Sequence, residues 1–123
     1  MKTLILALLA GAHLFGQPAV TEELLTASAS DFQTHAPPKP VDIRNLRLGA
    51  IEQGNGDQYL LCGEFRAGSG TEPSDWTPFA TIKTSGYEQW LGDQATTICG
   101  RQHITWEQNH DLSADLKEKL GLK

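Results

Sequence analysis

The sequence predicts an α+β domain: a small antiparallel sheet of three to four strands, one helix fastened to the sheet by a disulfide bond, and a second helix at the carboxyl end. Apolar and polar residues alternate in three segments between residues 41 and 83, as they do in half-buried strands. An Asn-Gly pair separates the first two segments and predicts a tight hairpin. The two cysteines of the chain stand in the second of these segments and at the end of the helix that follows the third.

Length and composition restrict the kind of protein. The chain has 123 residues, which is enough for one modest domain. Its 39% of hydrophobic and 20% of charged residues are ordinary for a folded soluble protein, and they exclude a polytopic membrane protein or a disordered chain. Nucleic-acid binding depends on clustered Lys and Arg, so the net charge of -5 leads us to expect no nucleic-acid partner.

The amino terminus has the layout of a secretory signal peptide. Lys2 precedes an apolar stretch over Leu4–Phe15, whose length as a helix is about 18 Å, well short of the ~30 Å hydrocarbon core of a membrane. We predict a signal peptide over residues 1–19 because of the position of Ala19, although Gln17 fits the small-x-small rule poorly; cleavage after Ala12 or Ala29 would follow the rule but lies early or late. The expected mature protein is periplasmic or secreted, has no stable membrane span, and carries a net charge of -6 because the lysine is lost.

Residues 20–40 are predicted to form a helix and a proline-rich connector that lead into the domain. The segment Thr21–Phe32 starts with a residue suited to capping, has acidic residues in its first turn and repeats apolar side chains at helical spacing. Three prolines between residues 37 and 40 then impose an extended chain. The single α+β domain is expected to span residues 41–123.

Three strands are predicted to form an antiparallel meander. Val41–Gln53 alternates between apolar residues on one face and polar residues or glycine on the other. Gln58–Ala67 returns after the Asn55-Gly56 turn, and because both of its faces begin apolar we expect it at the centre of the sheet. A polar loop over residues 67–75 leads into the third strand, Trp76–Lys83.

The remaining segments predict two helices and a short fourth strand. Ser85 and Glu88 match a capping box, and apolar residues follow at helical spacing, so we expect a helix over Gly86–Cys99. His103–Gln108 has the alternation of a short strand. From Asp111 onward leucines recur every four residues, with acidic residues early and lysines late, as the helix dipole favours.

Cys62 and Cys99 are expected to form a disulfide bond. An exported protein meets an oxidising compartment, and an even number of cysteines favours pairing. The bridge would fasten the predicted helix to one face of the sheet, and the loop it closes corresponds to about 4 kcal/mol of stability in the chain-entropy model. Two cysteines are too few for a four-ligand zinc site and too far apart for a CxxC redox pair.

Three short runs carry a resemblance to a known family: Arg44-Asn45-Leu46, Leu61-Cys62-Gly63-Glu64-Phe65 and Pro78-Phe79. They resemble the pattern of a family of small, largely uncharacterised exported proteins of Gram-negative bacteria, in which an F-R-N-V-like strand precedes a V-C-G-x-V/F strand motif and an aromatic strand. The resemblance covers residues 41–83. Arg66 and Gly68 stand where the family often has asparagines. The resemblance implies an exported protein and supplies no substrate or catalytic residue.

We predict a non-catalytic secreted or periplasmic binding protein whose partner is a periplasmic or envelope protein. The candidate binding residues are Asp75 and Trp76. Trp76 ends a polar loop, and we expect it to be the most exposed aromatic residue, whereas the other tryptophans are expected in the core.

A small secreted hydrolase of the ribonuclease type is the alternative. In such an enzyme Glu64 would take the proton from a ribose 2′-hydroxyl, Arg66 would hold the phosphate and His103 would protonate the leaving oxygen. His103, Glu107 and His110 would bind a metal only if they converged, and we predict no metal site. The sequence has no nucleophile elbow, phosphate-binding loop or dinucleotide motif, so we assign no catalytic residue and no cofactor.

Overall fold

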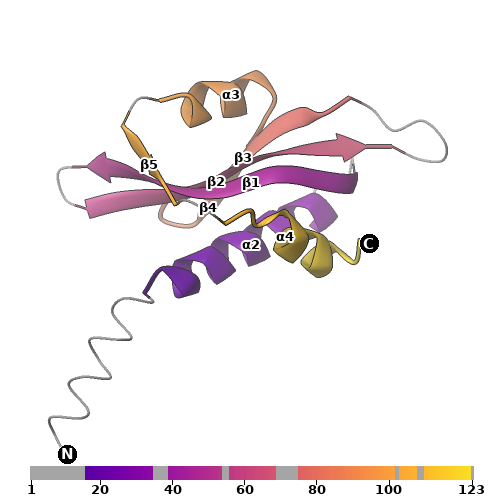
Figure 1. Cartoon of the computed structure of the whole chain (residues 1–123), viewed down its shortest axis with the longest axis horizontal. Coiled ribbons are helices and arrows are strands. Elements are labelled where there is room, and N and C mark those ends of the chain that lie inside the picture. The colour runs from indigo at the N-terminus through magenta and orange to yellow at the C-terminus, as the bar shows by residue number, and fades with distance from the viewer. Residues whose placement is uncertain are drawn as a thin grey trace, which may run out of the picture.

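A computed structural model of the chain describes residues 16–34, 39–53, 56–68, 75–101, 103–107 and 110–122. The elements in chain order are α2 (Gly16–Thr34), β1 (Pro40–Gln53), β2 (Gly56–Ala67), β3 (Thr77–Lys83), β4 (Tyr87–Leu91), α3 (Asp93–Cys99), β5 (Ile104–Trp106) and α4 (Ser113–Leu120). They form three layers: α3 covers one face of a sheet, and α2 and α4 lie on the other (Figure 1).

The described strands form one antiparallel sheet in the order β4-β3-β2-β1-β5. β2 lies at its centre, as its two apolar faces predict, and pairs with β1 and β3. The α+β class and the antiparallel sheet are confirmed, but the described part of the chain has five strands rather than three or four. Asn55 of the predicted turn lies outside the described residues, and β2 begins at Gly56.

The predicted helix over Gly86–Cys99 is wrong in its first half. That half forms β4, which pairs with β3, and only α3 is helical. Glu88 accepts the indole N–H of Trp90 at 3.1 Å through its Oε1 atom, where the predicted capping box would have turned it back toward Ser85. The short bend over residues 84–86 returns the chain directly alongside β3, so pairing in the sheet overrides the helical spacing.

The helix predicted ahead of the domain is part of the core. α2 includes the predicted Thr21–Phe32, and the Phe32 ring centroid lies 5.1 Å from that of Phe65 and 5.2 Å from that of Phe79. The packed unit therefore begins ahead of Val41, where the domain boundary is predicted. The residues that α2 contributes to the core are Leu24, Leu25, Ala29 and Phe32.

Two predictions about the amino-terminal region fall mainly outside the described residues. The predicted signal peptide covers residues 1–19, of which the structure describes only residues 16–19, as the start of α2. The predicted connector includes residues 35–38, which are also outside the described residues.

The two faces of the sheet carry separate hydrophobic clusters. The cluster under α2 and α4 contains, among others, Ile43, Leu46, Leu48, Leu61, Phe65, Phe79, Leu112 and Leu116. The cluster under α3 contains Ile51, Leu60, Cys62, Ala80, Ile82, Ala95 and Ile98. This division shows on which face of the sheet a strand side chain lies, and the candidate functional site lies on the face that carries α3.

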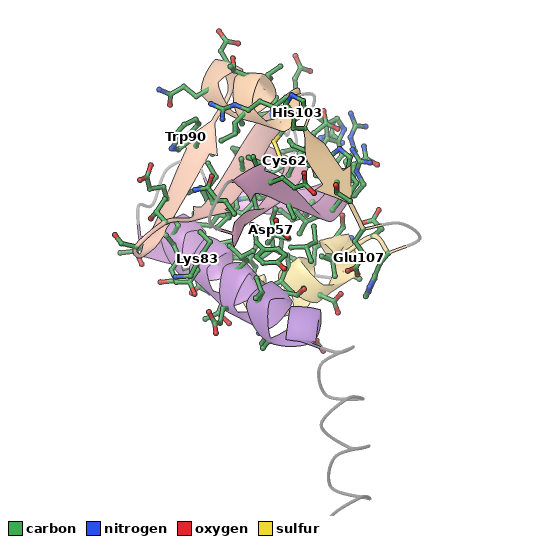
Figure 2. The ribbon with its side chains drawn as sticks, turned by 90° about the vertical axis from the view of Figure 1, so that its left-hand side faces the viewer. Asp57, Cys62, Lys83, Trp90, His103 and Glu107 are labelled. Atoms are coloured by element: carbon green, nitrogen blue, oxygen red, sulfur yellow. A yellow bond between two sulfur atoms is a disulfide. The ribbon has the colours of Figure 1, made fainter. Side chains whose placement is uncertain are left out.

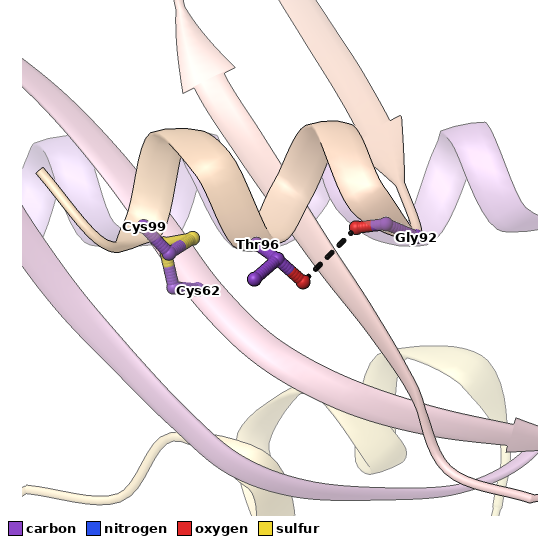
Figure 3. The surroundings of a disulfide bond; sticks show 4 residues. All are labelled: Cys62, Gly92, Thr96 and Cys99. Carbon is purple, nitrogen blue, oxygen red and sulfur yellow. Dashed lines mark hydrogen bonds between the residues drawn. A yellow bond between two sulfur atoms is a disulfide. The ribbon is translucent and has the colours of Figure 1, made fainter.

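The disulfide bond between Cys62 and Cys99 is confirmed, with Cα atoms 6.1 Å apart. It joins the end of α3 to the middle of β2, as predicted (Figure 3). Within α3 the Thr96 hydroxyl donates to the Gly92 carbonyl at 3.3 Å. A helix of seven residues is too short to be stable by itself in water, so the bridge and the contacts with the sheet hold it in place.

The carboxyl-terminal elements are close to those predicted. β5 is shorter than the predicted strand over His103–Gln108 and pairs only with residues 49–51 of β1. α4 is the predicted final helix, and its Leu116 is fully buried against the sheet.

Candidate functional site

Two arginines of β1 and one of β2 lie on the face of the sheet that α3 only partly covers. α3 packs mainly on β3 and β4, which leaves the β1 side of this face without a helix. On β2, Cys62, Glu64 and Arg66 share this face, because alternate residues of a strand point the same way. On β1, Arg47 lies opposite Cys62 and Arg44 lies opposite Glu64. Residues paired directly across two strands share a face, so both β1 arginines join Arg66.

The Trp76 ring contacts two of these arginines. The guanidinium carbon of Arg44 lies 4.2 Å from the Trp76 ring centroid, and that of Arg66 lies 4.9 Å from it. Cation–π contacts of this kind hold an aromatic ring and its charged neighbours in one geometry. The prediction that Trp76 is an exposed aromatic residue is corrected: it is half-buried, because the two arginine side chains cover its ring.

Trp106 of β5 makes a matching contact on the same face. Its ring lies under the guanidinium of Arg47, with 4.4 Å between the guanidinium carbon and the ring centroid. Gly49 makes room for this ring, since a Cβ atom at Gly49 would stand 2.8 Å from two ring carbons. We call the whole set the arginine–tryptophan surface; its members are Arg44, Arg47, Arg66, Trp76 and Trp106.

A β-bulge in β1 brings Arg44 and Arg47 to the same face. Residues three apart in a regular strand point to opposite faces. Between Arg44, which pairs with Glu64, and Arg47, which pairs with Cys62, β1 has two residues where β2 has only Gly63. The extra residue shifts the alternation by one, so both arginines end on the side of α3.

The bulge is stabilised from both of its faces. Asn45 has a φ of 57°, a left-handed conformation that asparagine tolerates better than most residues. Leu46 lies so close to Gly63 that a Cβ there would come within 2.8 Å of the leucine Cδ1 atom. The amino end of α4 forms hydrogen bonds with the backbone of Leu46. The Leu46 amide donates to the Ser113 hydroxyl at 3.1 Å, and the Leu46 carbonyl accepts from the Leu112 amide at 2.8 Å.

Glu64 places one negative charge within the arginine–tryptophan surface. Its Oε1 atom accepts hydrogen bonds from Arg44 Nε at 2.8 Å and from Asn45 Nδ2 at 3.2 Å. The bond from Arg44 holds the pKa of this carboxyl below its ordinary value, so Glu64 is ionised at neutral pH. Two further carboxylates lie beside the surface, because Asp42 is the cross-strand partner of Arg66 and Asp75 directly precedes Trp76, so the three guanidinium groups stand among carboxylates.

The residues of the predicted hydrolase do not all come together. Glu64 and Arg66 share a face two residues apart, but His103 precedes β5, whose Ile104 lies opposite Ile51 near the start of β2. Glu64 is six residues further along β2 than the partner of Ile51, which corresponds to about 20 Å. An acid and a base at that separation cannot act on one phosphate group.

The structure also shows where the candidate binding residue Asp75 and the candidate metal ligands Glu107 and His110 lie. Asp75 is exposed and directly precedes Trp76 at the edge of the arginine–tryptophan surface, whereas residues 69–74 of the predicted loop lie outside the described residues. His110 Nδ1 is 3.8 Å from Glu107 Oε1. Across the described ranges, no three His, Cys, Asp or Glu side chains are grouped so that they could hold a metal ion.

Sequence reasoning missed Arg44, Arg47 and Trp106 as members of a site. Arg44 and Arg47 fall on opposite faces of a regular strand, so only the bulge brings them together. The available signals are the glycines at 49 and 63, since a glycine inside a strand often marks a bulge or a close approach of another group.

Comparison with models of known protein families, with curated proteins and with solved structures found no match. Within the parts of the chain that the structure describes, no helix is both long enough and apolar enough to cross a membrane. The function therefore has to be argued from the geometry and charge of the molecule.

Proposed function

We propose that this chain is an exported, non-catalytic binding protein whose arginine–tryptophan surface binds an acidic patch on a periplasmic or envelope protein. The observation that carries the proposal is the contact of the Trp76 ring with both Arg44 and Arg66, on the part of the sheet face that α3 leaves open. The predicted signal peptide and the Cys62–Cys99 bond support export to an oxidising compartment.

The surface has the composition of a binding site. Tryptophan and arginine are the residue types that most often dominate the energy of protein interfaces. Here the two types already contact each other in the free protein, so binding would require little further ordering of long side chains. Guanidinium groups bind carboxylates with two parallel hydrogen bonds, which favours an acidic partner.

Quantitative capture from a periplasmic extract tests the proposal. The purified protein is immobilised, and bound proteins are compared by mass spectrometry between the wild type and Trp76→Ala or Arg47→Gln. We expect both variants to lose most of the same captured protein, and we expect wild-type capture to weaken with added salt, because exposed charges are screened within about 10 Å at 0.1 M salt.

Two variants on the opposite face provide matched controls. Tyr87 is also a half-exposed aromatic residue with a cation beside it, since Lys83 Nζ lies 4.8 Å from its ring centroid. Tyr87→Ala and Lys83→Gln therefore remove the same kinds of group at a different place and should leave capture unchanged. Equal capture by the wild type and by a folded Trp76→Ala variant would exclude the surface as the binding site.

A further inference from the structure

β4 is an edge strand, and half of its backbone groups point away from the sheet. Among the described strands it pairs only with β3, and Figure 2 shows it at one side of the sheet, with Trp90 labelled. The bonds from Thr84 N–H to the Gly86 carbonyl and from Gly92 N–H to the Pro78 carbonyl fix which residues face β3. Hydrogen-bonded pairs alternate along an antiparallel ladder, so the even-numbered residues of β4 bond to β3.

The outward N–H and C=O groups of β4 belong to Tyr87, Gln89 and Leu91. The residues that the structure describes supply no backbone partner for them. Both ends of this edge are open in the described part of the chain, because a Cβ atom added at Gly86 or Gly92 meets nothing within 4 Å. Such a row of free groups is a template to which another strand can add.

The outward row is self-complementary about its middle residue. When a second copy of β4 runs antiparallel with Gln89 opposite Gln89, Tyr87 of each copy lies opposite Leu91 of the other. Every outward N–H and C=O group of the strand then has a partner in the other copy. No other antiparallel register pairs all three outward residues with one another, so the length of β4 itself favours this one.

Two exposed apolar side chains of β4 would cover each other in this register. Leu91 pairs with Phe79, which belongs to the cluster on the α2 side, and alternation places Tyr87 and Gln89 on the same face. Tyr87 and Leu91 are each 40% exposed, and among the described large hydrophobic residues only Val41 is also exposed to this degree. Directly opposite residues contact each other, so each Tyr87 would cover Leu91 of the other copy.

Gln89 would gain the hydrogen bond that its side chain lacks. It borders a groove of about 330 Å³ between β4 and α2. Its Oε1 atom accepts from the Thr81 hydroxyl at 2.8 Å, whereas its Nε2 group is a buried donor with no hydrogen-bond partner among the described residues. An opposed Gln89 brings a carbonyl oxygen, which has lone pairs for two hydrogen bonds and can therefore accept from this donor as well as from Thr81. The arrangement is reciprocal, since each copy supplies one donor and one acceptor.

The α3 face of β4 opposes this pairing only weakly. Glu88 and Trp90 lie there, and Glu88 Oε1 accepts from the Trp90 indole N–H at 3.1 Å. In the symmetric register each Glu88 lies opposite Trp90 of the other copy, and the two Glu88 residues are diagonal neighbours about 7–8 Å apart. Two exposed like charges at that distance in water lower an affinity by about two- to threefold, and salt screens the effect.

Charge favours a second copy over a charged peptide at this edge. The groove beside β4 includes Asp31 and Glu88, whereas Lys83 stands on the α2 face with its Nζ atom 4.8 Å from the Tyr87 ring centroid. A peptide of either sign would therefore meet like charge. The three outward residues are themselves uncharged, and each finds its counterpart in another copy of β4.

We propose that two copies of this chain associate through their β4 strands, antiparallel and centred on Gln89, so that their two sheets become one continuous sheet. The contact is small, so the dimer is weak, with a Kd between about 10 µM and 1 mM. The β4 edge holds no residue of the arginine–tryptophan surface, and the inference does not rest on the proposed function.

Sedimentation velocity of the full, disulfide-bonded chain between about 10 µM and 1 mM tests the inference. We expect the mean mass to rise from that of a monomer toward that of a dimer. Gln89→Pro should abolish the rise, because it removes an outward N–H that makes no bond to β3, and an edge strand tolerates proline at such a position. Gln89→Ala keeps this N–H and should retain a dimer that is at most about tenfold weaker.

Glu88→Gln tests the register. It should tighten the dimer by about two- to threefold, because it removes the diagonal repulsion, and added salt should strengthen the wild-type dimer for the same reason. Asp57→Asn is the matched control, since it removes an exposed carboxylate of β2 and should leave the affinity unchanged. A gain of affinity that is confined to the dimer is not a result that a poorly folded variant would give.

Amide hydrogen exchange followed by NMR locates the contact in the wild type without any substitution. The amides of Tyr87, Gln89 and Leu91 should exchange more slowly at about 1 mM than at about 0.05 mM, whereas those of Glu88 and Trp90 already bond to β3 and should not change. Three results would overturn the inference: a chain that stays monomeric at about 1 mM, a dimer that a folded Gln89→Pro variant still forms, or exchange at the three outward amides that does not depend on concentration. Binding of an extended peptide at this edge by a chain that stays monomeric would assign the edge to a different partner.

Discussion

At the scale of single residues, Asn45 and Gly63 determine which side chains meet on the sheet. Asn45 accepts the left-handed backbone that one extra residue requires, and Gly63 leaves the space into which Leu46 packs. Together they place Arg44 and Arg47 on one face and leave the Leu46 side chain in the core. Asn45 and Gly63, which are neither charged nor aromatic, thus determine the geometry of the charged and aromatic site beside them.

Gly63→Ala is expected to destabilise the protein by about 1 to 3 kcal/mol, because the new Cβ would stand 2.8 Å from Leu46 Cδ1 and 3.1 Å from Leu46 Cα. Urea unfolding monitored by tryptophan fluorescence measures this change. Gly86→Ala is the matched control, since a Cβ at Gly86 meets nothing within 4 Å. Equal unfolding midpoints for the two variants would contradict the tight packing at Gly63.

Two carboxylates link stability to pH. Arg44 lowers the pKa of Glu64 through a hydrogen bond. Burial raises the pKa of Asp111, but hydrogen bonds from Ser113 and Leu46 outweigh it and leave that pKa lowered. A group with a lower pKa in the folded state binds fewer protons there, so its contribution is complete above the unfolded pKa and is lost as the pH falls through the folded one.

We therefore expect the free energy of unfolding to fall between roughly pH 5 and pH 2, and to fall less steeply in the double variant Glu64→Gln, Asp111→Asn. Each group is partly exposed, so its share is expected to be at most about 1 kcal/mol. Urea unfolding at several pH values gives the measurement. An identical pH profile for the wild type and the double variant would show that neither carboxylate contributes.

At the scale of elements, the disulfide bond is the main support of α3. The double variant Cys62→Ser, Cys99→Ser removes a link between residues 37 apart and is expected to cost about 4 kcal/mol of unfolding free energy. Hydrogen exchange should increase first in Asp93–Cys99, while α2 stays protected. Unfolding midpoints that do not differ between the oxidised wild type and the variant would show that packing alone holds α3.

The elements with strong local patterns could be predicted from the sequence. β1 and β2 follow from their alternation and the Asn-Gly turn, and the disulfide follows from the cysteine count. β4 could not be predicted, because Tyr87, Trp90 and Leu91 fit helical spacing as well as they fit a strand. The choice depends on β3 lying alongside, and such pairing is not a property of the segment itself.

The candidate site was predictable only in part, for a similar reason. Trp76 stands out as an aromatic residue at the end of a polar loop, and it does belong to the arginine–tryptophan surface. Arg44 and Arg47 could not be joined to it from their spacing, because a bulge reverses the alternation between them. The free edge of β4 was equally hidden, since a segment expected to be helical has no unpaired strand groups.

At the scale of the whole molecule, the first and last described helices close the same layer. α2 and α4 pack side by side under the sheet (Figure 1), and Lys119 of α4 forms an ion pair with Glu22 of α2. Lys117 Nζ also lies 3.3 Å from Asp42 Oδ1 at the start of β1. Both ends of the described chain therefore contribute to one core.

This arrangement restricts where the predicted signal peptide could be cleaved from a chain that still folds. Cleavage near Ala19 leaves every core residue of α2 in place, whereas cleavage after Ala29 would remove Leu24 and Leu25, which are at most 2% exposed. If the predicted signal peptide is cleaved, we expect the intact mass of the folded protein to correspond to a first residue ahead of Leu24. A folded protein that begins at Ser30 would contradict the role of α2 in the core.

The position of α4 in the chain also has a consequence for the order of events during synthesis. The bulge in β1 is made early, but one of the groups that bond to its backbone, the Ser113 hydroxyl, follows 67 positions after Leu46. Until then the core on that side of the sheet has the α2 residues but lacks Leu112 and Leu116. This side of the core therefore cannot close until the α4 segment has been made, and a chain that depends on such a long-range contact is expected to fold more slowly than one closed by local contacts.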